Sequence, residues 1–171
     1  LGGSSSSLAN FSGSFNLSTN TGTFRFNDGG GSGNTGSSNA VFDLGTGTVT
    51  FFTRNRGAAV NMGALFGGPT TRITQGSSSS GISTYSIGAK SIPCEYDGTI
   101  SDTGATAGVA ITKVGTSTFT LTGANTYSGL TTVNAGTLVI GTNGTSGQVG
   151  TNNIVDNATV VFNRSDAITV A

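Results

Sequence analysis

The sequence predicts an all-β protein that folds as a right-handed parallel β-helix, or β-solenoid. Short blocks of alternating apolar and polar residues run from end to end, and comparable blocks return about every twenty residues, within the range of solenoid repeats. More than half of the 171 residues are Gly, Ser, Thr or Asn. These are poor helix formers, and no helical apolar period is present. At about twenty to twenty-five residues per coil, we expect roughly seven or eight coils.

The alternating blocks predict fourteen short strands, taken in order along the chain. They cover residues 11–17, 22–27, 40–44, 47–53, 59–65, 71–75, 83–88, 98–101, 110–114, 118–122, 131–134, 137–141, 158–163 and 167–171. Because successive side chains of a strand point to opposite faces, alternation also predicts which residues point into the core. These are Phe24, Phe26, Val49, Phe51, Val60, Met62, Tyr85, Ile87, Phe119, Leu121, Leu138, Ile140, Val160 and Phe162.

Three tracts made almost entirely of Gly and polar residues predict loops that leave the coil, at residues 28–38, 76–81 and 142–151, and residues 1–7 predict a loose or linking terminus. None of them is long enough to separate two domains, so residues 1–171 are expected to form one solenoid domain. The chain begins with Leu1 instead of Met and ends in an alternating run. We therefore expect a processed product or a piece of a longer secreted protein.

The charge content excludes several classes of partner. Seven Lys and Arg residues balance seven Asp and Glu residues, and charged residues make up 8% of the chain. Nucleic acids and anionic membrane surfaces are bound by clustered basic side chains, so neither partner is expected. No apolar run is long enough to cross a bilayer as a helix, so no membrane-spanning segment is predicted.

Few residues could carry chemistry. The closest carboxylates of the same strand parity are Glu95 and Asp97, with Asp102 a few residues on. Such a group could supply the acid and base of a polysaccharide lyase or hydrolase, or bind Ca²⁺, but solvated turn residues are the more common explanation. The chain has no His and one Cys, so Cys94 has no imidazole partner and no internal disulfide. We expect no enzyme, no cofactor and no metal.

The most informative segment is residues 113–141, which read KVGTSTFTLTGANTYSGLTTVNAGTLVIG. This segment closely resembles the autotransporter-associated β-strand repeat, also called the passenger-associated transport repeat, of large secreted bacterial proteins. The resemblance implies a parallel β-solenoid that is exported to the cell surface or the extracellular space. It assigns a structural role to the motif residues, with a turn at Asn125 and packing at Tyr127. The motif residues are Gly123, Asn125, Tyr127, Gly129, Val133, Gly136 and Leu138.

The expected function is structural: an extracellular β-solenoid that forms or spaces a bacterial surface fibre, sheath or adhesin stalk. The expected partner is another copy of the chain, by head-to-tail or lateral association, because a solenoid end exposes unpaired strand edges. Two alternatives stay open. One is an adhesin domain that binds glycans or host matrix through its loops, and the other is a polysaccharide lyase or hydrolase on the same scaffold.

Overall fold

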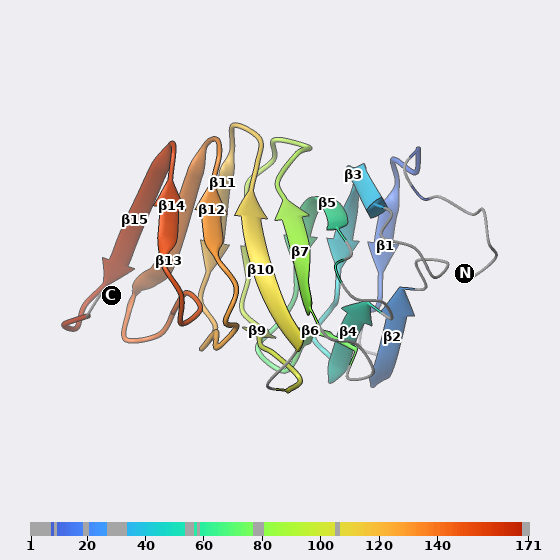
Figure 1. The fold of residues 1–171 in the computed structure, drawn as a ribbon, viewed down its shortest axis with the longest axis horizontal. Helices are drawn as coiled ribbons and strands as arrows, with labels where there is room; N and C mark the ends of the chain where they lie inside the picture. The colour runs from blue at the N-terminus through green and yellow to red at the C-terminus, as the bar shows by residue number, and fades with distance from the viewer. Residues whose placement is uncertain are drawn as a thin grey trace.

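The computed structural model describes residues 8, 10–18, 21–26, 34–53, 57, 59–76, 81–104 and 107–168. Within these ranges the chain forms fifteen strands that wind into an elongated spiral with the two termini at opposite ends (Figure 1). None of the described residues belongs to a helix that is long and apolar enough to span a membrane.

The strands form three sheets. The long sheet has seven strands: β1 (Ser14–Asn16), β3 (Asn34–Asp43), β5 (Ala59–Phe66), β7 (Gly81–Ile87), β10 (Ala107–Lys113), β12 (Thr131–Val133) and β14 (Ile154–Asp156). The N-terminal sheet has β2 (Gly22–Phe26), β4 (Val49–Thr53), β6 (Arg72–Gln75) and β9 (Thr99–Ile100). The C-terminal sheet has β8 (Cys94–Tyr96), β11 (Thr118–Leu121), β13 (Thr137–Gly144) and β15 (Thr159–Arg164).

All strand pairs in the three sheets are parallel, and each inner strand of a sheet pairs with its counterparts one turn earlier and one turn later. Ile111 of β10, for example, lies beside Tyr85 of β7 on one side and Thr131 of β12 on the other. Parallel neighbours need a long connection, which here is the rest of the coil. The predicted all-β parallel solenoid is therefore confirmed. The right-handed sense of winding stays a prediction, based on the strong preference of parallel crossover connections.

The cross-section has three sides. One turn, from β7 through β8 and β9 to β10, visits all three sheets. The C-terminal sheet begins only at β8. In the turns before it, the same side of the coil is an irregular segment, but this segment still stacks on its neighbour, since the Leu44 N–H donates to the Phe66 carbonyl at 2.9 Å. In later turns the side of the N-terminal sheet is irregular, and the Thr126 N–H donates to the Ile100 carbonyl at 2.9 Å. Stacking is thus continuous even where the regular strands stop.

The number of coils is lower than expected. Five of the seven strands in the long sheet lie between two neighbours, which gives about five fully stacked turns instead of seven or eight. The reason is the length of the turns. Ile111 pairs with Thr131, twenty residues on, but Ser14 pairs with Val41, twenty-seven residues on. Seven strands at about 4.8 Å spacing give a rod of roughly 30 Å.

Most predicted strands are present, with shifted ends. The sequence missed β8 and β14, which have three residues each. Strand β8 does alternate, with exposed Glu95 between buried Cys94 and Tyr96, but the run is too short to stand out in the sequence. The loop predicted at residues 28–38 is wrong where β3 begins at Asn34, because the backbone of this polar tract pairs with β5. The loop predicted at residues 142–151 begins inside β13.

At the C-terminal end, Ala167 and Ile168 are not in a strand, contrary to the prediction for residues 167–171. A bend at Ser165 and Asp166 precedes them. Arg164 and Asp166 form an ion pair across this bend, with 2.6 Å between the guanidinium nitrogen and the carboxylate oxygen. The predictions for residues 1–7, for residues 77–80 of one loop and for the side chain of Phe26 lie outside the described residues.

The core is a set of columns that run along the axis of the rod, each built from inward side chains of successive coils. Phe119 of β11 lies between Cys94 and Leu138 of the neighbouring strands, and all three are buried. Towards the N-terminus the core is aromatic, and the rings of Phe24 and Phe51 stack with centroids 5.7 Å apart. Each coil buries few large side chains, so its stability depends on its neighbours.

Replacing Phe119 with Ala should lower the free energy of unfolding by about 3 to 5 kcal/mol, because the ring is fully buried and leaves a cavity. Thr120→Ala is the matched control on the same strand. Its side chain points outward, so its effect should stay within about 0.5 kcal/mol. Equal effects of the two substitutions in chemical denaturation would contradict the assigned register.

Candidate functional site

The repeat motif forms the irregular side of the coil between β11 and β12. Its side chains alternate as in a strand, although no strand is present there. Gly123, Asn125, Tyr127 and Gly129 are buried, and the residues between them are exposed. The turn therefore places its polar and aromatic motif residues inside the rod, next to the coils before and after it.

Asn125 connects three successive coils. Its side chain is fully buried. The Oδ1 atom accepts a hydrogen bond from the Ile100 N–H at 2.8 Å in the preceding coil, and Nδ2 donates to the Gln148 carbonyl at 2.6 Å in the following coil. An amide side chain can accept on one atom and donate on the other, so it satisfies backbone groups on both sides of the coil.

Tyr127 fills the corner that follows Asn125. Its ring is fully buried, and its hydroxyl lies 2.7 Å from the Thr131 Oγ1 atom at the start of β12. Burial raises the pKa of the phenol, so the hydroxyl stays protonated. A buried tyrosine hydroxyl needs a hydrogen-bond partner, and Thr131 supplies it within the same coil.

The motif glycines allow the coils to approach closely. A Cβ atom on Gly123 would lie 1.9 Å from the Gly98 carbonyl oxygen of the preceding coil. Gly136, between β12 and β13, has a φ of 68°, which favours glycine. Val133 and Leu138 on either side of this corner are buried. All seven motif residues thus lie at contacts within or between coils.

Lys113 was not singled out from the sequence, but it is part of the same corner. It occupies an inward position of β10, between Ile87 and Val133 of the adjacent strands, and is buried. Its ammonium group donates to the carbonyls of Val114 at 2.7 Å, Gly115 at 2.8 Å and Ala135 at 3.1 Å. Burial lowers the pKa of this ammonium. The signal in the sequence that could have identified Lys113 is a charged residue at an inward position of a predicted strand.

The acidic residues do not form one cluster. Glu95 is exposed on β8, and partial loss of solvent together with the Asp97 carboxylate raises its pKa. Asp97 accepts a hydrogen bond from the Thr122 hydroxyl at 2.5 Å.

Asp102 lies apart from the pair and holds two backbone N–H groups, those of Val109 at 2.8 Å and Ser128 at 2.9 Å. Among the residues that the structure describes, no group of three or more His, Cys, Asp or Glu side chains could hold a metal ion.

Cys94 is a core residue. Its side chain is 5% exposed and lies beside Phe119 in the inward column. Burial raises the pKa of the thiol, which disfavours the reactive thiolate. The arrangement is that of a structural cysteine.

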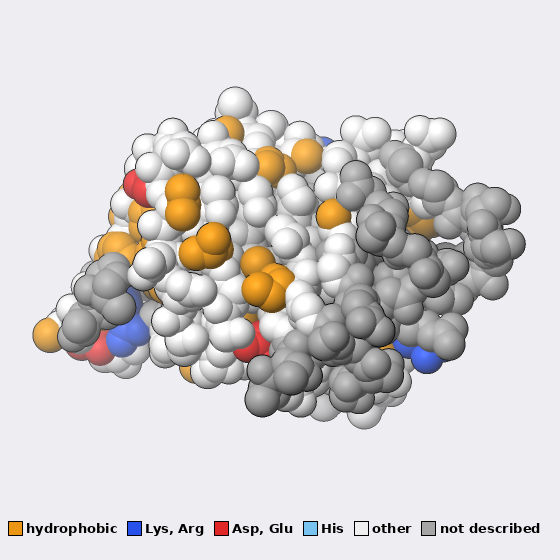
Figure 2. Space-filling model, in the orientation of Figure 1, with side chains coloured by type: hydrophobic (Ala, Val, Ile, Leu, Met, Phe, Trp, Pro, Cys, Tyr) orange, Lys and Arg blue, Asp and Glu red, His pale blue; other side chains and the backbone are white. Residues whose placement is uncertain are grey.

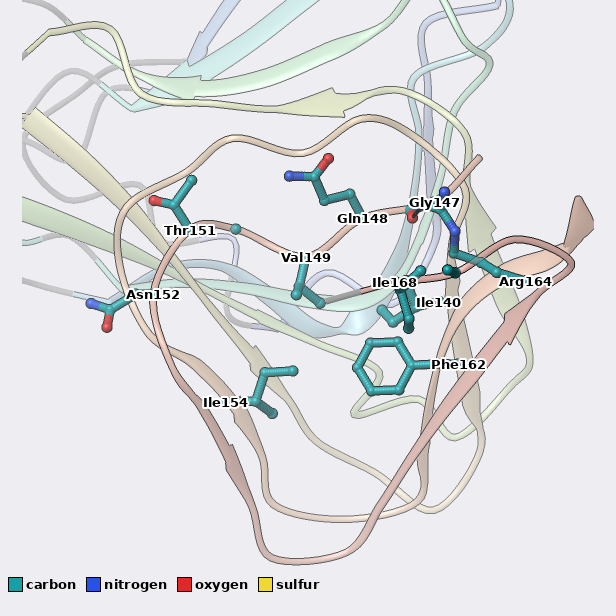
Figure 3. A pocket seen from close by; sticks show the side chains of 12 residues that line it. Ile140, Gly147, Gln148, Val149, Thr151, Asn152, Ile154, Phe162, Arg164 and Ile168 are labelled. Atoms are coloured by element: carbon teal, nitrogen blue, oxygen red, sulfur yellow. Dashed lines mark hydrogen bonds between the residues drawn. The ribbon is translucent and has the colours of Figure 1, made fainter. Parts of the chain in front are cut away.

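A cavity of about 350 Å³ opens at the C-terminal end of the rod (Figure 3). The inward side chains of the last coils form its apolar floor: Ile140, Val149, Ile154, Phe162 and Ile168. Gln148 and Arg164 lie at its edge, and the Arg164 guanidinium donates to the carbonyls of Thr145 and Gly147. The cavity lies beside the last described coils, and none of the predicted carboxylates lines it.

The three parallel sheets and the turn in which Gly123, Asn125 and Tyr127 are buried define a stacked parallel β-solenoid. Residues 111–140 match the family model described as Passenger-associated-transport-repeat, so the chain carries this repeat. The chain is also 39% identical over 71 residues to the adhesin BmaC autotransporter of Brucella suis biovar 1 (strain 1330). The match covers 42% of this chain and 2% of that protein. No solved structure matches the chain.

Asn125→Ala should lower the free energy of unfolding by about 2 to 4 kcal/mol, because it leaves the Ile100 N–H and the Gln148 carbonyl without their partner. Thr126→Ala, at the exposed next position, is the control and should be close to neutral. Thermal and chemical unfolding of both variants check the expectation. A neutral Asn125→Ala would show that the bridge adds no stability.

Cys94 should resist alkylation in the native protein because its thiol is buried and its pKa is raised. We expect labelling to be roughly a hundredfold slower than in the denatured chain, since reaction needs an opening of about 3 kcal/mol. Mass spectrometry of iodoacetamide time courses measures both rates. Fast labelling of the folded chain would contradict the assigned position of β8.

Proposed function

We propose that this chain is a structural section of an extracellular adhesin-type protein, in which the solenoid spaces or builds a stalk, fibre or sheath on a bacterial surface. The observation that carries the proposal is the unbroken stacking of coils through the passenger repeat at residues 111–140. The repeat and the similarity to an autotransporter adhesin support export to the cell surface or the extracellular space.

The geometry suits a spacer. The strands of the long sheet stack from β1 to β14, so every added turn of 20 to 27 residues lengthens the rod by about 4.8 Å. Buried side chains fill the interior along the axis, and Asn125 and Lys113 bind adjacent coils at the corners. The face shown in Figure 2 carries few charged side chains, and its hydrophobic side chains lie in small separate groups.

A non-enzymatic role is the better supported one. Glu95 is exposed, Asp102 is used to hold backbone N–H groups, and the cavity at the end of the rod is lined by neither. An acid–base pair needs both groups directed at a bound substrate, and neither Glu95 nor Asp102 lines the cavity at the C-terminal end or the one beside Leu17 and Phe24.

The second candidate function is glycan or host-matrix binding through loops. The observation that favours it is the similarity to a protein named as an adhesin. The matched 71-residue segment covers 2% of that protein, so the adhesive part of the relative can lie elsewhere in its length. Under this alternative, extracellular glycans are the partner. Under the spacer proposal, the partner is another copy of the chain.

The folded chain should show no retention on glycan and matrix-protein arrays above that of an unrelated protein of similar size and charge. Binding that is lost when the segment at residues 76–81, which the sequence predicts to be a loop, is shortened, while the unfolding temperature stays the same, would replace the spacer with the glycan-binding alternative. A binding signal that survives the separate shortening of all three predicted loops, at residues 28–38, 76–81 and 142–151, would contradict both proposals.

A further inference from the structure

One corner of the rod has a polar interior, although the inward columns elsewhere are mainly apolar. It lies where the N-terminal sheet meets the long sheet. The inward residues there are Thr53 at the end of β4, Gln75 at the end of β6 and Ser83 of β7, and all three are fully buried. Thr53 and Gln75 are cross-strand neighbours, and the hydroxyl oxygens of Thr53 and Ser83 lie 3.1 Å apart. We call these three residues the polar corner.

The amide of Gln75 is the group in the polar corner whose hydrogen bonds are not accounted for. Its side chain is fully buried, and neither Oε1 nor Nε2 has a hydrogen-bond partner in the part of the chain that the structure describes. The backbone around it is paired. The Gly76 N–H donates to the Thr53 carbonyl at 2.9 Å, and the Gln75 carbonyl accepts from the Thr103 hydroxyl at 2.8 Å. The coils on both sides therefore fix Gln75, and its amide points into the rod.

Asn125 shows how a buried amide is normally satisfied in this fold. It is as deeply buried as Gln75, but it accepts from the Ile100 N–H and donates to the Gln148 carbonyl. Buried polar groups in native proteins are almost always hydrogen-bonded to protein or to ordered water. Because no described protein group bonds the Gln75 amide, a bound molecule is the remaining partner.

The surroundings define what this molecule can be. The described charged side chains next to the corner are engaged elsewhere. The Arg72 guanidinium donates to the Ser101 hydroxyl at 2.7 Å and to the Asp102 carbonyl at 3.1 Å. The Asp102 carboxylate accepts from the N–H groups of Val109 and Ser128 at 2.8 and 2.9 Å. The ligand must therefore be neutral and small, and it must both donate and accept hydrogen bonds. Water meets all of these requirements.

We propose that the polar corner is an internal hydration site, in which ordered water bonds to the Gln75 amide and to the hydroxyls of Thr53 and Ser83. These groups give a buried water molecule the two to four hydrogen bonds that it typically makes. The site lies within the stack, because β6 lies between β4 and β9, and β7 lies between β5 and β10. It does not depend on what precedes or follows the chain, and it is independent of the spacer role.

Water–protein nuclear Overhauser effects in the intact chain test the proposal with three side-chain amides in one sample. The Gln75 amide protons should show a cross-peak to water with the sign of a molecule that stays bound for longer than about a nanosecond. The Asn125 amide is equally buried but bonded to backbone, so it should show no such cross-peak. The exposed Gln148 amide should show the opposite sign, which is that of mobile surface water.

A crystal structure of the wild type provides a second measurement that does not depend on hydroxyl protons, which exchange with water and can pass on their own signal. It should show ordered water within about 3 Å of Oε1 or Nε2 of Gln75. Gln75→Leu keeps a side chain of similar size without the amide, and it should lose this water while the strands keep their register. A Gln75 amide without long-lived water, or one bonded to another group of the protein, would overturn the proposal.

Discussion

The parallel hydrogen bonding from one coil to the next is the constraint on which the rest of this structure depends. It places every inward residue over a partner about one turn away, so Phe119 lies between Cys94 and Leu138 and Ile111 lies between Tyr85 and Thr131. The core is therefore a set of columns and not a single centre. A coil has no independent core, so its stability depends on the coils on either side of it.

The corners are where this constraint is hardest to satisfy, because the chain must turn while its backbone groups stay paired. Asn125 and Lys113 solve the problem with side chains that bond backbone groups of the same and neighbouring coils. Gly123 solves it by having no side chain where two coils nearly touch. Gln75 is an exception among the described residues, since neither polar atom of its buried amide has a hydrogen-bond partner. Such a group lowers stability.

Period-two alternation predicted the strands and the inward columns well, because burial on one face leaves a strong record in sequences such as TFTL and TLVI. It missed β8 and β14, which have only three residues each and become strands by pairing with adjacent coils. The prediction of a loop at the polar start of β3 was wrong because the backbone there pairs with β5. The motif predicted the fold. The three-sided path and the three carbonyls that bind the Lys113 ammonium group depend on contacts between residues of different coils. Alternation within one strand does not encode these contacts.

Backbone nuclear Overhauser effects around β11 are the most direct test of the coil-to-coil register. The account predicts that protons of Phe119 are close to those of Cys94 in one direction and Leu138 in the other, in the pattern of parallel strands. Close Hα–Hα contacts between β11 and β12, as in an antiparallel hairpin, would contradict the solenoid and the function proposed from it.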